Sequence, residues 1–168
     1  MTRTFPRRGV PALAAILLAT PTFADVTVTF REGAPKDRFT IEQTGECGLG
    51  STDVTIDLSG SASGLVFDVT GSGAGVQVFQ PFELVAGQDL LSGQPVVRDG
   101  DQRITLPVTG LLAGQTIAFT IDVDDTVGTR EITVSDSEII GASVRVGDRS
   151  AEFGADAIAR LSLPDCLS

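Results

Sequence analysis

Residues 117–123 read Ile-Ala-Phe-Thr-Ile-Asp-Val, so that Ile117, Phe119, Ile121 and Val123 alternate with small or polar residues. Alternation with a period of two places the apolar side chains on one face of an extended strand and the polar ones on the other. The stretch therefore predicts a strand with one buried face. The same pattern recurs in short runs at residues 26–30, 54–58, 65–69, 104–108, 132–134, 142–146 and 159–163.

Segments rich in Gly, Ser and Asp separate these runs, and no helical period occurs after residue 24. Asp99-Gly100 reads as a tight turn that needs a positive φ, and Pro107 indicates an edge strand or a bulge. Eight to ten short strands at this spacing predict an all-β fold, a single antiparallel β-sandwich of the immunoglobulin-like, Greek-key type. Pro81–Gln94 is the longest irregular stretch and is expected to be a surface loop.

Residues 1–24 have the features of a secretory signal peptide. Arg3, Arg7 and Arg8 precede an apolar run at residues 10–19, and the segment ends on Thr22-Phe23-Ala24. The run is too short to span a membrane, which takes about 20 residues. We therefore expect an exported protein, periplasmic or extracellular, with one domain at residues 25–168. Ordinary and twin-arginine export both remain open.

Cys47 and Cys166 are the only cysteines. Export would place them in an oxidising compartment, where two cysteines allow one disulfide. The pair lacks the Cys-x-x-Cys spacing of redox motifs, and no Lys or His lies near either thiol in the sequence. The sequence therefore predicts a structural Cys47–Cys166 bond that pins the C-terminal end to an early segment.

The composition excludes several chemistries. The 168 residues contain no His, Trp, Tyr or Asn, so a Ser-His-Asp triad, a Cys-His dyad, a His-bearing zinc site and an N-glycosylation acceptor are all impossible. Without the leader the chain would have nine basic residues against 22 acidic ones, a net charge of −13. Such a surface repels nucleic acid and anionic membranes and suits the binding of cations.

The acidic run at Asp122, Asp124 and Asp125 is the main candidate site. Alternation predicts that Asp122 and Asp124 point away from the core, and a short loop would bring Glu131 opposite one of them. Like charges that meet across strands are unfavourable unless a cation or a basic group intervenes. Carboxylate oxygens suit Ca²⁺, so these four residues are a candidate calcium site. A solvated acidic hairpin partly neutralised by Arg130 is the alternative.

Other carboxylates have simpler interpretations. Asp99 and Asp101 flank Gly100 and are expected to serve the turn, although they could form a second cation site. Asp53, Asp57 and Asp68 are expected on outward strand positions. A pair of them could resemble glycosidase carboxylates, but the chain has no Trp or Tyr on which a sugar could stack. Phe79-Gln80-Pro81-Phe82 is expected to close one end of the core, with an exposed contact patch as the alternative.

Several stretches resemble small exported bacterial proteins of the "aggregation factor core" family. They are Gly33-Ala34-Pro35-Lys36-Asp37-Arg38-Phe39, residues 64–71, residues 79–82 and residues 119–126. The resemblance implies calcium-dependent adhesion or self-association and brings no catalytic motif.

Residues 114–134 are also similar to the second half of a Calx-beta domain, with Asp122, Asp124, Asp125 and Glu131 matching its acidic positions. Calx-beta loops carry further acids where this chain has residues 126–130. The start of the domain resembles immunoglobulin-like adhesion domains, which implies fold alone.

The sequence thus predicts a non-enzymatic interaction module that recognises a protein, a cell surface or its own copies, with calcium as a possible cofactor. The alternatives are a small-ligand-binding domain with a pocket near Pro81–Gln94 and a hydrolase that uses carboxylates alone.

Overall fold

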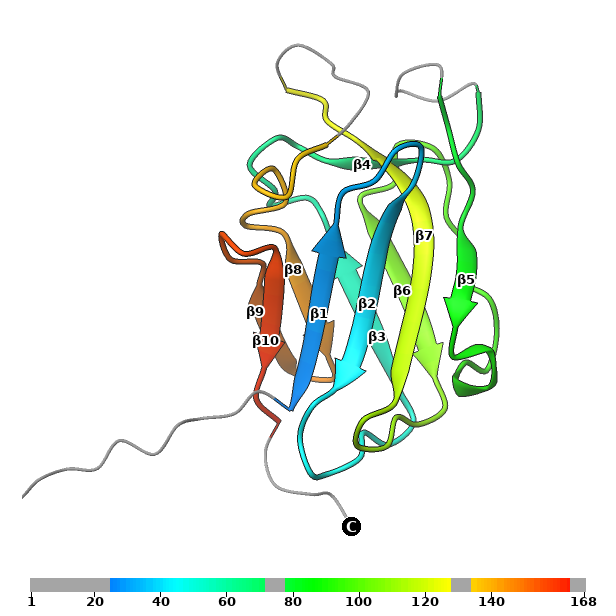
Figure 1. Cartoon of the computed structure of the whole chain (residues 1–168), viewed down its shortest axis with the longest axis vertical. Helices are drawn as coiled ribbons and strands as arrows, with labels where there is room; N and C mark the ends of the chain where they lie inside the picture. Colours follow the sequence, from blue (N-terminus) through cyan, green and yellow to red (C-terminus); the bar gives the residue numbers. More distant parts are fainter. Residues whose placement is uncertain (1–24, 72–77, 128–133, 164–168) are drawn as a thin grey trace, which may run out of the picture.

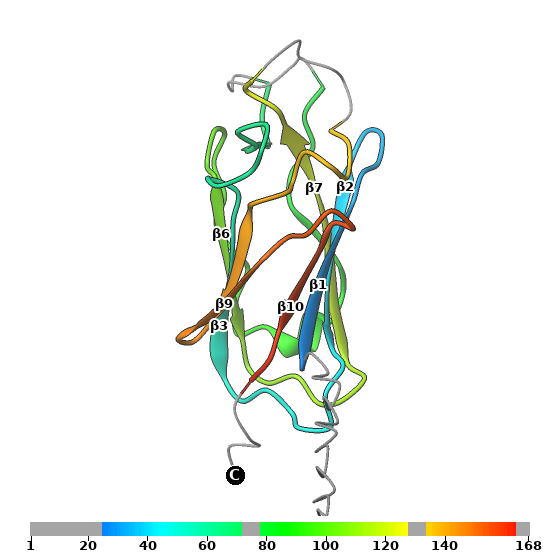
Figure 2. The same cartoon turned by 90° about the vertical axis from the view of Figure 1, so that its left-hand side faces the viewer.

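The computed structural model describes residues 25–71, 78–127 and 134–163. Ten strands in these residues form two antiparallel sheets that pack face to face (Figures 1 and 2). The predicted all-β antiparallel sandwich is therefore confirmed. No helix long and apolar enough to cross a membrane occurs in the described ranges.

The first sheet has the strand order β10-β1-β2-β7-β4, with β5 also paired to β7. Its strands are β1 (Val26–Arg31), β2 (Asp37–Gln43), β4 (Val66–Asp68), β5 (Glu83–Ala86), β7 (Thr116–Asp124) and β10 (Ile158–Leu161). The long strand β7 pairs with β2 along one edge. On its other edge it pairs with β5 through residues 118–120 and with β4 through residues 122–124.

The second sheet has the strand order β6-β3-β8-β9. Its strands are β3 (Thr52–Asp57), β6 (Arg103–Val108), β8 (Ser143–Val146) and β9 (Arg149–Glu152). β6 lies at the edge of this order, as Pro107 predicted, because proline has no backbone N–H to donate to a further strand. The 3-10 helix η1 (Gln88–Leu90) lies in the connection between β5 and β6.

The inner faces carry the apolar residues of the period-two pattern. Phe39 lies at the centre of an aromatic cluster, with ring centroids 5.1 Å from Phe30, 5.2 Å from Phe119, 6.4 Å from Phe67 and 6.5 Å from Phe153. All five rings are at most 1% exposed. Burial of aromatic side chains is a large part of the free energy that holds two such sheets together.

Three strands differ from the sequence expectation. Alternation at Phe39 and Ile41 had not been recognised as a strand, yet β2 lies between β1 and β7. Pro81–Gln94 was expected to be irregular, but it contains β5 and η1. β9 was also unforeseen, because its residues are polar. The run predicted at residues 132–134 lies outside the described residues except for Val134, which is buried.

Candidate functional site

Four aspartates gather at one end of the sandwich, where β7 ends beside β4 and the start of β2. Asp122 and Asp124 belong to β7, Asp68 is the last residue of β4, and Asp37 is the first residue of β2. Asp122 and Asp68 are directly opposite across the two strands. We call Asp37, Asp68, Asp122 and Asp124 the aspartate cluster.

The expectation that Asp122, Asp124 and Asp68 face solvent is wrong. Asp122 is 5% exposed, Asp124 3% and Asp68 2%. β4 pairs with the edge of β7 here. The backbone of Gln80 also connects the two strands, because its N–H donates to the Asp68 carbonyl and its carbonyl accepts from the Asp122 N–H. A strand's own alternation cannot reveal burial that a separate segment imposes.

The chain after the cluster is also held in place. The Thr126 N–H donates to the Ser63 carbonyl, and the Thr126 hydroxyl donates to the Gly64 carbonyl at 2.7 Å. Asp125, between these anchors and the cluster, is 6% exposed. Glu131, the fourth predicted calcium ligand, lies outside the described residues, so its position opposite Asp122 or Asp124 stays a prediction.

Asp37 belongs to the cluster although nothing in its sequence neighbourhood indicates it. Its Oδ1 accepts from the Gly33 N–H at 3.1 Å, and its Oδ2 accepts from the Val123 N–H at 3.0 Å. Burial raises the pKa of Asp37 to about 8 against these two bonds, and the charges of Asp122 and Asp124 add to the rise. The carboxyl group thus ties the start of β2 to the end of β7.

Asp122 and Asp68 each have a buried oxygen without a hydrogen-bond partner, Oδ2 of Asp122 and Oδ1 of Asp68. Burial, followed by the charges of Asp124 and Asp68, raises the pKa of Asp122 to about 7. Burial, the charge of Asp124 and a hydrogen bond with Asp124 raise the pKa of Asp68 to about 6. Unpartnered buried carboxylate oxygens are costly, so these two require a proton or a cation.

Within the described residues, no three acidic, cysteine or histidine side chains already converge as a metal ion would require. The two unpartnered oxygens belong to Asp68 and Asp122, which are cross-strand partners, and Asp124 is a third member of the same cluster. A bound cation would have to draw further oxygens inward, and Ca²⁺ tolerates such variable geometry.

The turn at Asp99 needs no cation to explain it. The Asp99 Oδ1 accepts from the backbone N–H groups of Val69 and Thr70 at 2.7 Å each, and the Thr70 hydroxyl donates to its Oδ2. The hydrogen bond from Thr70 is the main cause of the lowered pKa of Asp99. Gly100 has the positive φ of 77° that the turn predicted.

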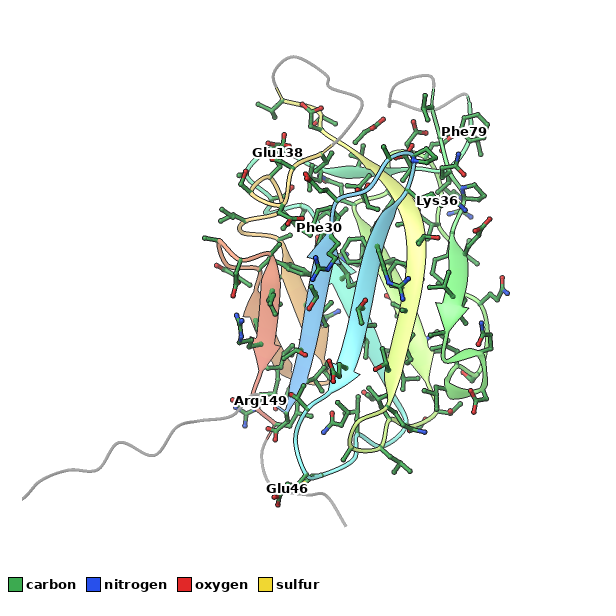
Figure 3. All side chains as sticks on the ribbon, in the orientation of Figure 1. Phe30, Lys36, Glu46, Phe79, Glu138 and Arg149 are labelled. Carbon is green, nitrogen blue, oxygen red and sulfur yellow. The ribbon has the colours of Figure 1, made fainter. Side chains whose placement is uncertain are left out.

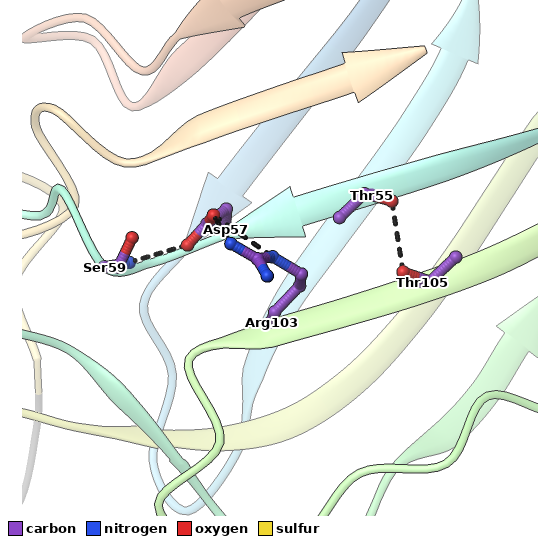
Figure 4. Close-up of polar contacts among 5 residues, drawn as sticks. All are labelled: Thr55, Asp57, Ser59, Arg103 and Thr105. Carbon is purple, nitrogen blue, oxygen red and sulfur yellow. Dashed lines mark hydrogen bonds and ion pairs between the residues drawn. The ribbon is translucent and has the colours of Figure 1, made fainter. Parts of the chain in front are cut away.

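Asp57 on the second sheet is paired with an arginine. The Arg103 guanidinium donates to Asp57 from the neighbouring strand, and the Ser59 N–H donates to Asp57 at 3.0 Å (Figure 4). Burial disfavours ionisation of Asp57, but these bonds outweigh it and lower its pKa. The hydroxyls of Thr55 and Thr105 lie 3.1 Å apart beside this pair (Figure 4).

The predicted pocket region contains an open groove of about 530 Å³, lined by Phe82, residues 83–85, Gln88 and residues 91–94. Its lining mixes apolar and polar side chains. Phe82 packs on Phe119 with ring centroids 5.0 Å apart, as expected of a residue that closes the core. Phe79 is 40% exposed and lies at the same end of the molecule as Lys36 (Figure 3).

Cys47 is not a free thiol in the structure. Its expected partner, Cys166, lies outside the described residues, so the pairing stays a prediction. The flanking backbone agrees with it, because the Gly45 N–H donates to the Asp25 carbonyl and the Leu163 N–H donates to the Asp25 carboxylate at 2.6 Å. Residues near both cysteines thus meet at Asp25.

No family model matches the chain, and no curated protein matches it. Among solved structures, a family GH18 chitinase from Chromobacterium violaceum is 15% identical over 79% of this chain, which spans 19% of the chitinase, with a TM-score of 0.33. A second solved structure is a biomass-sensing module from putative RsgI-like proteins of Clostridium thermocellum, described as resembling a family 3 carbohydrate-binding module of the cellulosome. It is 15% identical to this chain, and the match covers 84% of this chain and all of the module, with a TM-score of 0.33. A second such module, from Rsgi2 of the same organism, is 10% identical over 86% of this chain and 98% of its own, with a TM-score of 0.30. At these scores the likeness carries no functional information.

Proposed function

We propose that this protein is an exported, non-enzymatic interaction module whose loop end is stabilised by a calcium ion at the aspartate cluster. The observation that carries the proposal is the pair of buried, unpartnered oxygens on Asp68 and Asp122, which are directly opposed residues of β4 and β7. Asp124 adds a third carboxyl group, and Asp125 and Glu131 are the adjoining ligands expected from the sequence.

A divalent cation would resolve the electrostatic conflict in the cluster. Buried carboxylates with raised pKa values repel one another when ionised, and a cation of opposite charge removes the repulsion. Ca²⁺ takes six to eight hard oxygen ligands, which aspartates, backbone carbonyls and water can supply. The ion would fasten the ends of β7 and β4 to the start of β2, and so hold the neighbouring loops in one arrangement for a partner.

A binding role also fits the chemistry of the chain. The sequence has no histidine. Asp57 on the second sheet is paired with Arg103, whereas Asp68 on the first sheet is buried. A hydrolase limited to carboxylates needs two of them facing a substrate in a cleft. The aspartates that do face one another, Asp68 and Asp122, are buried.

Thermal unfolding in calcium and in chelator tests the cation. A ligand that binds only the folded state stabilises it by about 2.7 kcal/mol at a hundredfold excess over Kd, which raises Tm by several degrees. Asp124→Asn and Asp122→Asn are expected to abolish the rise while the chelated protein stays folded. Asp148→Asn is the matched control, because its side chain is 93% exposed and it removes the same charge.

An unchanged Tm of the wild-type protein in calcium would remove the cation from the proposal. An equal loss in Asp148→Asn would mean that calcium only screens the acidic surface. The interaction role is tested on cells: release of the protein by chelator and its return with calcium are expected, and the released chain should begin near Asp25.

A further inference from the structure

Two arginines lie directly opposite one another on the outer face of the first sheet. Arg31 is the last residue of β1, and Arg38 is its cross-strand partner near the start of β2, the strand that lies between β1 and β7 (Figure 1). Both side chains are exposed. Residues paired in this way have Cα atoms about 5 Å apart, so two positive charges face solvent side by side.

Among the described residues, neither arginine has an acidic side chain within ion-pair distance. Lys36, Arg103, Arg149 and Arg160 each form an ion pair with an acidic side chain. Over the described parts of the chain, no ion pair includes Arg31 or Arg38, although acidic residues far outnumber basic ones. Like charges directly opposite across strands are destabilising.

Three threonines lie next to the two arginines in the register of the first sheet. Thr120 follows Arg38 in the same cross-strand row, and its next neighbour, Glu83, is engaged by Lys36. The next row contains the directly opposed pair Thr29 and Thr40. Thr29 and Thr40 are partly exposed and lie two residues along their strands from Arg31 and Arg38, on the same outer face. The Thr120 hydroxyl is buried and has no hydrogen-bond partner in the described part of the chain.

We propose that this face, Arg31 and Arg38 with Thr29 and Thr40, binds a carboxylate-bearing polysaccharide. A guanidinium group donates two parallel hydrogen bonds to a carboxylate, and one anion placed between the two arginines removes their repulsion. Threonine hydroxyls donate to and accept from sugar hydroxyls. A protein partner would usually anchor through large apolar side chains that fill pockets, and this set of residues offers no such pocket.

This partner deepens the proposed function by supplying the substance that the module recognises. The arginine face lies outside the aspartate cluster, although Arg38 follows Asp37 directly on β2. Cation binding would stabilise the start of β2, the strand that carries Arg38. The polymer is contacted by the arginines themselves. The two proposals can therefore fail separately.

Affinity electrophoresis of the full exported chain through gels with carboxymethyl-dextran, neutral dextran or dextran sulfate tests the inference. Retardation by carboxymethyl-dextran and not by neutral dextran is expected, weakening between low ionic strength and about 0.15 M salt. Arg31→Gln/Arg38→Gln should bind at least about tenfold more weakly. The control Arg98→Gln/Arg145→Gln removes the same charge from exposed arginines elsewhere and should bind like the wild type.

Four outcomes would overturn the inference. They are no retardation of the wild type, an equal loss in both double variants, retardation by dextran sulfate alone, and a changed oligomeric state of Arg31→Gln/Arg38→Gln with polymer binding intact. The last would make a second copy of the chain the occupant. A calcium-induced rise in Tm that persists in Arg31→Gln/Arg38→Gln would separate this surface from the cation site.

Discussion

The Asp122 carboxyl group is buried beside Asp68 and Asp124, and its ionisation without a cation costs free energy. Asp37 differs from Asp122 because two backbone N–H groups donate to its carboxyl oxygens and so offset part of the free-energy cost of burying them. The same residue type therefore serves two purposes in one cluster. Asp37 is part of the hydrogen-bonded frame, whereas Asp122 has an oxygen that the protein does not satisfy.

Asp122→Asn is expected to stabilise the chelator-treated protein at pH 8. Asparagine has nearly the same shape and no charge, so the repulsion from Asp68 and Asp124 disappears. A gain of about 1–2 kcal/mol in the free energy of unfolding is expected, since each unit of pKa shift corresponds to about 1.4 kcal/mol and part of the shift comes from burial that remains. Urea unfolding measures it, with Asp148→Asn as control. A marked loss of stability would mean that Asp122 holds the fold through its charge.

The strands that the sequence did not predict show what stabilises a strand when its side chains do not alternate. β9 contains Arg149, Ser150, Ala151 and Glu152, and β5 has no fully buried residue, so neither shows apolar alternation. Such strands are held by backbone pairing to a neighbour, which leaves little trace in the side-chain pattern. β2 is different, because Phe39 and Ile41 do alternate with polar residues and could have been recognised.

Gly87→Ala tests the attachment of β5 to β7. Gly87 has a φ of 79°, and an added Cβ would lie 2.9 Å from the Thr116 carbonyl oxygen. Backbone strain and the clash together are expected to cost about 2 kcal/mol in urea unfolding. Gly93→Ala in the same connection is the control, because a Cβ there meets nothing within 4 Å. Equal stability of the two variants would show that β5 shifts without cost.

For the whole molecule, the raised pKa values predict how stability depends on pH without calcium. Asp37 has an ordinary pKa of 3.8 when unfolded and about 8 when folded, so between these values the folded state holds more protons. Stability therefore falls as pH rises from about 4 to 8, and Asp122 and Asp68 act in the same direction. The lowered pKa values of Asp57 and Glu138 act oppositely, since their contribution is lost as pH falls through them.

Urea unfolding of the chelated protein across this pH range is expected to show the greatest stability in mildly acidic solution. Saturating calcium should flatten the decline toward pH 8, because the ion replaces the protons in the cluster. A chelated protein that gains stability between pH 5 and pH 8 would contradict the burial of these carboxyl groups.

The predicted Cys47–Cys166 bond is a second property of the whole chain. A loop of 119 residues would contribute about 4–5 kcal/mol on the chain-entropy model. Reduction should therefore lower the free energy of unfolding by that order, and the Cys47→Ser/Cys166→Ser variant should not respond to reductant. Two titratable thiols in native protein recovered from outside the cytoplasm would contradict the pairing.

What the sequence determined by itself was the all-β class, because period-two alternation is a local property that each strand carries in its own residues. The absence of histidine likewise excluded whole classes of catalysis from composition alone. Asp122 and Asp124 could be proposed as a candidate site from the sequence because they are close together in the chain.

Only the tertiary structure decided that Asp37 and Asp68 join them and that the group is buried. These residues come from β2, β4 and β7, and the order of strands in the sheet brings them together. The opposition of Arg31 and Arg38 likewise depends on the register of β1 with β2. Sheet order and register follow from how the whole chain packs, so they cannot be read from the spacing of residues within one strand.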